Sequence, residues 1–167
     1  MVSVAPVGVS RVHAFADRAW AQYLEQNPLW ATSQGDERWD DRLDDPGPEG
    51  RAAQLAMVED WAAELCAFDD VDQSTEDAVT LDLMRVVVTR MRQAHGLRLW
   101  EMEAIDQYGG PQGLIGDLAR LQRADTPERL GRLLTRLAAY PAWMDAHRAN
   151  VEAGLVADRT AAAPVVG

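Results

Sequence analysis

The chain has 167 residues, of which 47% are hydrophobic, and this is the size and composition of one folded domain and not of a disordered chain. Its formal net charge of -11 excludes nucleic acid and an anionic membrane surface as partners, because both need a basic face. All sixteen positive side chains are arginine, and a single cysteine, Cys66, excludes an intramolecular disulfide and a cysteine zinc cluster.

The start of the chain does not carry a targeting signal. Residues 1–10 lack the basic start and the apolar stretch of a signal peptide, and no run approaches the ~20 apolar residues of a membrane span. We therefore expect a soluble protein in the cytoplasm. We also expect a flexible N-terminus over residues 1–10, a single helical domain over 11–158, and a flexible or truncated tail over 159–167.

Apolar residues at three- and four-residue spacing predict a first helix over residues 10–26. Ser10 is in the N-cap position, and Asn27-Pro28 ends the helix because a residue before proline disfavours helical backbone. Pro28 then opens a short helical turn that closes at Gly35.

Residues 36–50 are the most acidic segment, with seven carboxylates and two interspersed arginines, Arg38 and Arg42. A calcium loop is one interpretation, but the carboxylate spacing does not match an EF-hand and the central glycine is missing. We expect instead a solvated loop whose charges are partly paired.

Two long helices are predicted next. Pro48 begins the first, whose inner stripe includes Cys66, which we interpret as a small core residue and not as a nucleophile. Ser74 caps the second, which extends to His95 and ends at Gly96. Because its apolar residues cover more than one face, this helix is expected to lie at the centre of a bundle.

The middle of the chain contains a break rich in glycine and proline, Gln107-Tyr108-Gly109-Gly110-Pro111-Gln112-Gly113. Residues 97–108 before it fit either a helix or an extended segment, and Pro111 opens a new helix after it. The break predicts a hinge between two helical halves, and irregular backbone of this kind often displays binding groups. Alternatively, free N–H groups at residues 110–113 hold an anion at the helix start.

The C-terminal part predicts two further amphipathic helices. Thr126 and Pro127 start the first, Tyr140-Pro141 ends or kinks it, and the last helix stops near residue 158. No repeat or convincing strand pairing is present. The sequence therefore predicts an all-α fold, an irregular bundle of about six helices with the Gly/Pro-rich break in the middle.

The three histidines, His13, His95 and His147, do not have the spacing of a metal site on one helix. His13 lies one turn before Asp17, and a surface histidine–carboxylate hydrogen bond is preferred there over a shared metal or proton. His95 suits the negative end of its helix, and His147 falls on an apolar stripe. We predict no metal ligand and no catalytic residue from these patterns.

Two other sets of side chains indicate packing more than chemistry. Glu101 and Glu103 lie near Asp106 beside the break, but residues two positions apart do not share a helix face, so we do not assign them acid–base catalysis. The six tryptophans are spread over every predicted helix and suggest core and interface packing instead of one aromatic site: Trp20, Trp30, Trp39, Trp61, Trp100 and Trp143.

A series of short stretches keeps a recognisable order and spacing: YLEQNPLWATSQG (23–35), DDRL (40–43), Pro48-Glu49, STEDAVTLD (74–82), QYGGP (107–111), DTPERL (125–130), LAAYPAWM (137–144) and EAGLVADR (152–159). Together they resemble the N-terminal region of the bacterial domain-of-unknown-function family 885. The resemblance covers about residues 12–163.

The resemblance implies a mostly helical protein similar to zinc metallopeptidases, whose members usually run several times longer. Their presumed metal-binding helix carries an H-E-x-x-x-x-H-like signature far downstream. No His-Glu pair of that kind occurs here, so no catalytic residue of the family is carried onto this sequence. We therefore expect no cofactor in this chain, and zinc only with the missing C-terminal part of the family fold.

Three functional hypotheses follow. In the first, the chain is the N-terminal helical scaffold of a metallopeptidase- or hydrolase-like protein, not catalytic by itself, separated from its metal-binding half by truncation or a split gene. Its cleft-facing residues are then Gln107, Tyr108, Gly109, Gly110 and Gln112, and its partner is the complementary C-terminal half or a second copy. The alternative is a stand-alone helical protein–protein interaction module, and a third hypothesis is a bundle that binds a small ligand or a metal.

Overall fold

The computed structural model describes residues 10–68, 74–102 and 110–160, and within these ranges every regular element is helical. The all-α prediction is therefore confirmed. The α-helices are α1 (Arg11–Gln26), α2 (Pro28–Ser33), α3 (Pro48–Leu65), α4 (Thr75–Gly96), α5 (Leu114–Leu121) and α6 (Pro127–Val156). Short 3-10 turns lie between them: η1 (Glu37–Trp39), η2 (Leu99–Met102) and η3 (Pro111–Gly113).

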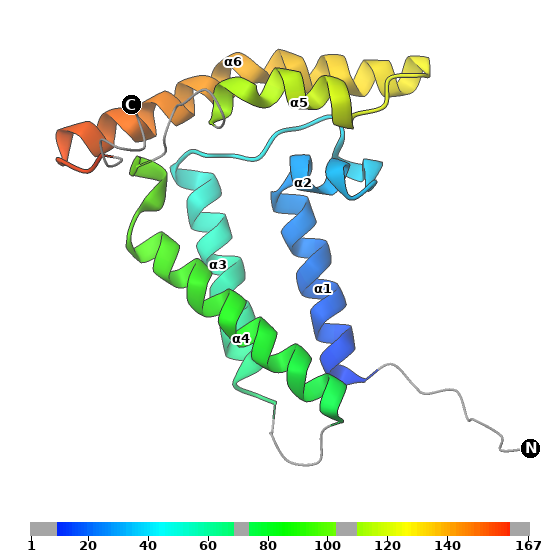
Figure 1. Ribbon diagram of the computed structural model, residues 1–167, viewed down its shortest axis with the longest axis vertical. Helices are drawn as coiled ribbons and strands as arrows, with labels where there is room; N and C mark the ends of the chain where they lie inside the picture. Colours follow the sequence, from blue (N-terminus) through cyan, green and yellow to red (C-terminus); the bar gives the residue numbers. More distant parts are fainter. Residues whose placement is uncertain (1–9, 69–73, 103–109, 161–167) are drawn as a thin grey trace, which may run out of the picture.

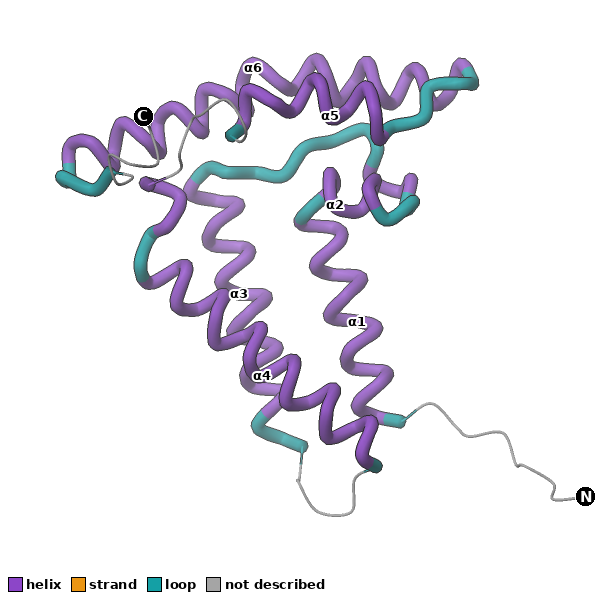
Figure 2. The backbone as a smooth tube through the Cα atoms, viewed as in Figure 1, coloured by secondary structure: helices purple, strands orange, loops and turns teal. Residues whose placement is uncertain are grey.

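The helices form two groups. The long helices α1, α3 and α4 extend side by side from one end of the molecule, and α5 and α6 lie together across that end (Figure 1). The loop that joins η1 to α3 runs along the α5–α6 pair (Figure 2). Within the described residues no helix combines the length and the apolarity needed to cross a membrane.

Each group has its own apolar core. The lower core, between α1, α3 and α4, consists of Val12, Phe15, Ala19, Met57, Val58, Trp61, Ala62, Leu65, Leu81 and Val88. The upper core is smaller and contains Leu114, Leu118 and Trp143, with Leu29 and Leu43 packed against it from α2 and the following loop. The N-terminal third of the chain therefore contributes to both groups.

The predicted helix caps are observed. Ser10 accepts a hydrogen bond from the His13 amide, and its hydroxyl donates to Asp77 Oδ1 at 2.6 Å, which joins the starts of α1 and α4. Ser74 and Thr126 cap α4 and α6 in the same way. At the central break, Gly110 has φ 101° and ψ 168°, a conformation that is essentially restricted to glycine.

Pro141 does not end a helix, because α6 continues through it to Val156. The two C-terminal helices expected from the sequence are therefore one. Proline in a helix interior costs about 3 kcal/mol. We attribute its tolerance to the packing on both sides of it, where Arg136 and Trp143 are buried.

The prediction that α4 lies at the centre of the bundle is wrong. Val79, Leu83 and Val86 are 63%, 61% and 47% exposed, because only α1 and α3 pack against the helix and its third face has no neighbour among the described residues. The prediction that Cys66 is a core residue is also wrong: it is exposed. The helix α3 ends at Leu65, which occupies the inner position, and Cys66 is its C-cap.

Candidate functional site

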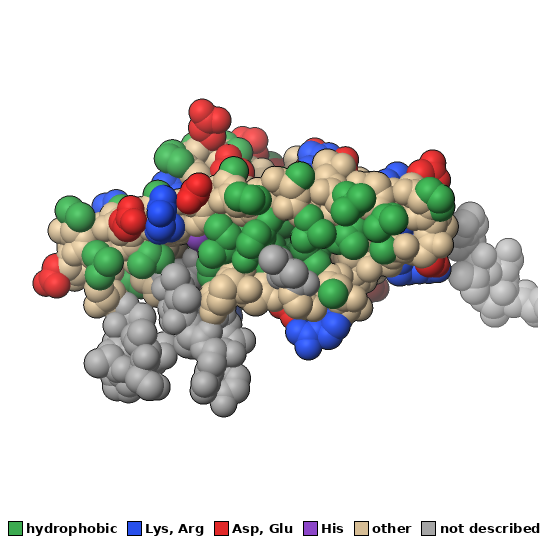
Figure 3. Space-filling view, turned by 90° about the horizontal axis from the view of Figure 1, so that it is seen from above, with side chains coloured by type: hydrophobic (Ala, Val, Ile, Leu, Met, Phe, Trp, Pro, Cys, Tyr) green, Lys and Arg blue, Asp and Glu red, His purple; other side chains and the backbone are tan. Residues whose placement is uncertain are grey.

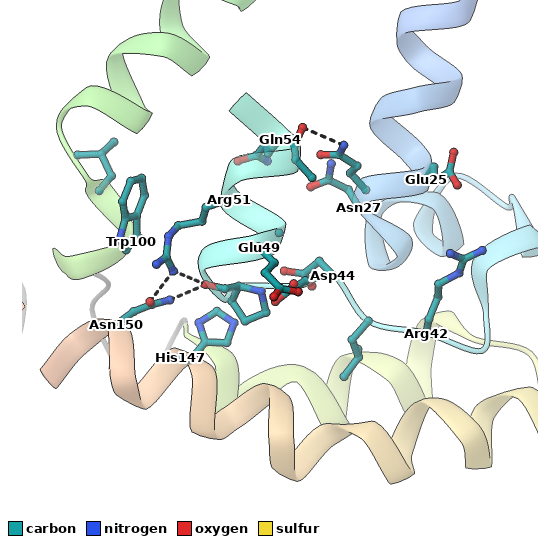
Figure 4. A pocket seen from close by; sticks show the side chains of 17 residues that line it. Glu25, Asn27, Arg42, Asp44, Glu49, Arg51, Gln54, Trp100, His147 and Asn150 are labelled. Atoms are coloured by element: carbon teal, nitrogen blue, oxygen red, sulfur yellow. Dashed lines mark hydrogen bonds between the residues drawn. The ribbon is translucent and has the colours of Figure 1, made fainter. Parts of the chain in front are cut away.

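A hollow with a largely polar lining lies where α3, η2 and α6 meet the loop that precedes α3. Its volume is about 650 Å³. It is lined from the end of α1 by Glu25, Gln26 and the following Asn27, from the loop by residues 42–46, from α3 by Glu49, Gly50, Arg51, Ala53 and Gln54, from η2 by Leu99 and Trp100, and from α6 by His147 and Asn150. We call it the polar hollow (Figure 4).

Arg51 is held in one orientation inside this hollow. Its Nη1 donates to the carbonyl oxygen of Pro46 at 2.5 Å and to Asn150 Oδ1 at 2.6 Å, and Asn150 Nδ2 donates to the same carbonyl at 2.9 Å (Figure 4). The guanidinium also stacks on the Trp100 ring, 4.8 Å from the ring centroid. Its Nε and Nη2 groups have no hydrogen-bond partner among the described residues and are available to a ligand.

On the α6 side of the hollow, the lining residue His147 packs against Trp143 of the upper core. The rings of Trp143 and His147 meet edge to face with centroids 4.2 Å apart, and Trp143 Nε1 donates to Asp44 Oδ1 at 3.2 Å. His147 is half-buried beside Trp143 and belongs to the lining of the hollow.

Carboxylates outnumber cations around the polar hollow: Glu25, Asp44, Asp45 and Glu49 face Arg42 and Arg51. Within the described residues, no three His, Cys, Asp or Glu side chains converge closely enough to hold a metal ion. The arrangement suits hydrogen bonding to a polar ligand, with Arg51 as a pre-oriented donor.

A second hollow adjoins the first and is lined mainly by apolar and aromatic side chains. Its volume is about 760 Å³, and it lies between α1 and α4. Trp20, Trp30, Trp61 and Trp100 line it, so the expectation of dispersed tryptophans is wrong: four helical segments bring four of them together. We call it the aromatic groove. Asn27, Gln54, Leu99 and Trp100 line both hollows and connect them.

The stretch predicted to face a cleft is only partly described. Gln107, Tyr108 and Gly109 lie outside the described residues, whereas Gly110 precedes η3 and Gln112 is exposed on that turn. Neither Gly110 nor Gln112 lines the polar hollow or the aromatic groove. The cleft-facing role of this stretch stays a prediction.

The other two histidines and Glu101 contact charged or aromatic side chains of neighbouring segments. His13 meets carboxylates, as expected, but they belong to α4 and not to Asp17: Nδ1 lies 3.2 Å from Asp77 and Nε2 3.4 Å from Glu76. The His95 ring packs against Trp100 with centroids 5.0 Å apart. Glu101 is buried and paired with two arginines, Arg98 and Arg159. Glu103 and Asp106 lie outside the described residues.

The acidic segment contains a buried cluster that the sequence did not reveal. Asp40 is only 2% exposed, and it accepts a hydrogen bond of 2.6 Å from the Thr32 hydroxyl and lies 3.7 Å from Nη2 of the fully buried Arg136. The expected charge pairing is present in the same segment, in Arg38 with Asp36 and Arg129 with Glu37, but the expected full solvation is not. A signal existed, because Arg136 interrupts the apolar stripe of α6 between Leu133 and Leu137.

Comparison with known protein families identifies a match that covers most of the chain. The family described as "Bacterial protein of unknown function (DUF885)" matches residues 28–167, which is most of the chain and most of the range over which the short stretches suggested the resemblance. A search of curated proteins gave no match.

Proposed function

Because this chain belongs to the DUF885 family of bacterial proteins of unknown function, we propose that it is the helical scaffold of a hydrolase-like protein and that its polar hollow forms one wall of a substrate cleft. In this proposal the chain is cytoplasmic and does not catalyse the reaction by itself. Catalysis needs a complementary part of the family fold, which carries the zinc ligands.

The observation that carries the proposal is the fixed guanidinium of Arg51. Its contacts to Pro46, Asn150 and Trp100 orient it, while Nε and Nη2 donate no hydrogen bond to any described residue. An arginine held in this way binds a carbonyl or carboxylate oxygen of a substrate with little loss of conformational freedom. Residues from α3, η2 and α6 supply this arrangement, so a folded domain is needed to form it.

The donor set in the part of the chain that the structure describes does not fit zinc. The sequence lacks the His-Glu pair of the resemblance, and the described residues contain no converging group of three donors. No catalytic step is therefore assigned to a metal here. The residues of the polar hollow bind and orient the substrate.

The test begins with the DNA that adjoins the gene, which we expect to encode a segment with an H-E-containing helix, in frame or frame-shifted. Co-expressed with this chain, that segment should form a complex with zinc-dependent hydrolase activity. Arg51→Gln should raise KM about tenfold with a smaller change in kcat, since one charge-assisted hydrogen bond is lost. Arg148→Gln, at an exposed position of α6 outside the hollow, is the matched control.

Two results contradict the proposal. One is stoichiometric zinc together with hydrolase activity in the purified chain alone. The other is the absence of any H-E-containing segment that complements this chain.

A second candidate function is a helical interaction module. A band of hydrophobic side chains runs along the outer face of α5 and α6 (Figure 3), and the exposed apolar residues of these helices include Leu121, Leu130 and Leu134. Exposed apolar patches of this kind mark protein–protein contacts. Light scattering should then show that the chain associates with a second copy of itself or with the complementary half. Leu134→Glu should abolish this association. A chain that stays monomeric and binds neither partner contradicts this function.

A further inference from the structure

The aromatic groove has a composition that differs from the polar hollow beside it. The α1 side contributes Trp20 and Tyr23, whose rings stack with centroids 5.8 Å apart, and Trp61 closes the floor with its Nε1 donating to Gln22 at 2.7 Å. The α4 side is mainly aliphatic, with Leu83, Met84, Val87 and Met91, and also carries Arg90 and His95. An elongated apolar molecule would contact aromatic rings on one side and aliphatic side chains on the other.

The groove contains one strong positive charge and no negative charge. Arg90 is the only arginine that lines it, and no Asp or Glu does so. Every other arginine of the chain contacts a carboxylate, a carbonyl or amide oxygen, or an aromatic ring, whereas Arg90 has no such partner in the described ranges 10–68, 74–102 and 110–160. In a chain of net charge -11, Arg90 is therefore an arginine with neither a carboxylate nor another polar or aromatic partner among the described residues.

We propose that the aromatic groove binds an amphipathic carboxylate, with its anionic head at Arg90 and its aliphatic body between α1 and α4. The charge of the groove selects an anion, because Arg90 donates to a carboxylate and no acidic side chain of the lining opposes it. The apolar lining selects an aliphatic body, because binding removes the apolar surface of the ligand and that of the groove from water.

The dimensions of the groove favour a small molecule over a protein partner. A volume of about 760 Å³ lies within the range of small-molecule sites. On α4 the lining runs from Leu83 to His95, which spans roughly 18 Å of helix axis.

This inference is independent of the hydrolase proposal. Arg51, on which that proposal depends, does not line the aromatic groove, and Arg90 does not line the polar hollow. The two sites share Trp100, so a ligand in one changes the surroundings of the other.

The test is calorimetric titration with decanoate below its micelle-forming concentration, with tryptophan emission as the second readout. We expect one decanoate per chain and a change in emission. Decanol, which has the same body without the charge, and butanoate, which has the charge without the body, should both bind at least about tenfold more weakly.

Variants then locate the site. Arg90→Gln should weaken decanoate about tenfold and leave decanol unchanged, whereas Trp30→Ala should weaken both. Arg92→Gln, two positions along α4 and paired with Glu59 outside the groove, is the matched control and should leave decanoate binding unchanged.

Three results overturn the proposal. The wild type does not bind decanoate, or it binds decanol as tightly as decanoate. In the third, the Arg90→Gln variant binds decanoate as tightly as the wild type does. The comparison of decanoate with decanol uses only the wild-type chain, so the proposal remains testable even where a variant does not fold.

Discussion

At Arg136 the guanidinium is fully buried, and three of its four close acceptors come from segments about a hundred residues earlier in the chain. It donates to the carbonyl oxygens of Trp39 at 2.6 Å and Arg42 at 2.8 Å, to the Thr32 hydroxyl at 3.0 Å and to the Gln122 amide oxygen at 2.9 Å. Burial lowers the pKa of this guanidinium, and the nearby charge of Asp40 opposes the shift. This residue joins α6 to the loop that forms one side of the polar hollow.

We expect Arg136→Leu to lower the free energy of unfolding by about 3–5 kcal/mol, because it leaves the buried Asp40 carboxylate without its cation. Urea denaturation measures this loss. Adding Asp40→Asn should recover part of it, and Arg148→Leu, at an exposed position of the same helix, should cost no more than about 0.5 kcal/mol. Equal losses at positions 136 and 148 would show that the buried cluster contributes little.

At the scale of elements, the polar hollow depends on the close approach of α6 to η2. A Cβ atom added to Gly154 would lie 2.1 Å from the carbonyl oxygen of Glu101 and 2.8 Å from that of Arg159. Both neighbours are backbone atoms, so they cannot move away as a side chain does. Glycine at this position therefore sets the distance at which Trp100 and Asn150 face each other across the hollow.

Two alanine substitutions in α6 should have opposite effects. Gly154→Ala should destabilise the protein by at least about 2 kcal/mol, because the backbone has to shift. Gly131→Ala, where a Cβ meets no atom within 4 Å, should stabilise it by about 0.5–1 kcal/mol through helix propensity alone. Thermal unfolding of both variants measures the difference, and a stabilising Gly154→Ala would exclude the close contact.

At the scale of the whole molecule, carboxylates are in excess, and several of them form ion pairs with exposed arginines. Hydrogen bonds from Arg38, Arg92 and Arg129 lower the pKa of Asp36, Glu59 and Asp125 respectively, from ordinary values of 3.8, 4.5 and 3.8. A carboxylate with a lowered pKa in the folded state stabilises the protein above its unfolded pKa, and this contribution is lost as the pH falls through the folded value.

We therefore expect the urea midpoint to be constant near neutral pH and to fall below about pH 4.5 as these carboxylates take up protons on unfolding. Salt at 0.5 M should reduce the dependence, since all three pairs are at the surface and are screened. A midpoint that rises in acid would contradict the assigned direction. Arg92→Gln, which removes the partner of Glu59, should make the urea midpoint fall less steeply with decreasing pH.

Most helices and their starting points were determined by the sequence alone, because the signals are local; the helix expected to start after Pro141 is instead part of α6. Ser10, Ser74 and Thr126 each cap a helix whose first turn lies within three residues, and Gly110 supplies a conformation that other residues do not adopt. The order and spacing of such signals also indicated the family, which the match over residues 28–167 confirms.

The sites were decided only by the tertiary structure, because each joins residues from distant parts of the chain. Arg51 meets Asn150 across 99 positions, and Arg136 meets Thr32 across 104. Four dispersed tryptophans converge because α1, α2, α3 and η2 border one groove, and α4 exposes an apolar face because too few helices pack on it. Periodicity shows that a face is apolar, but only the packing of the other helices decides whether that face is buried or lines a binding groove.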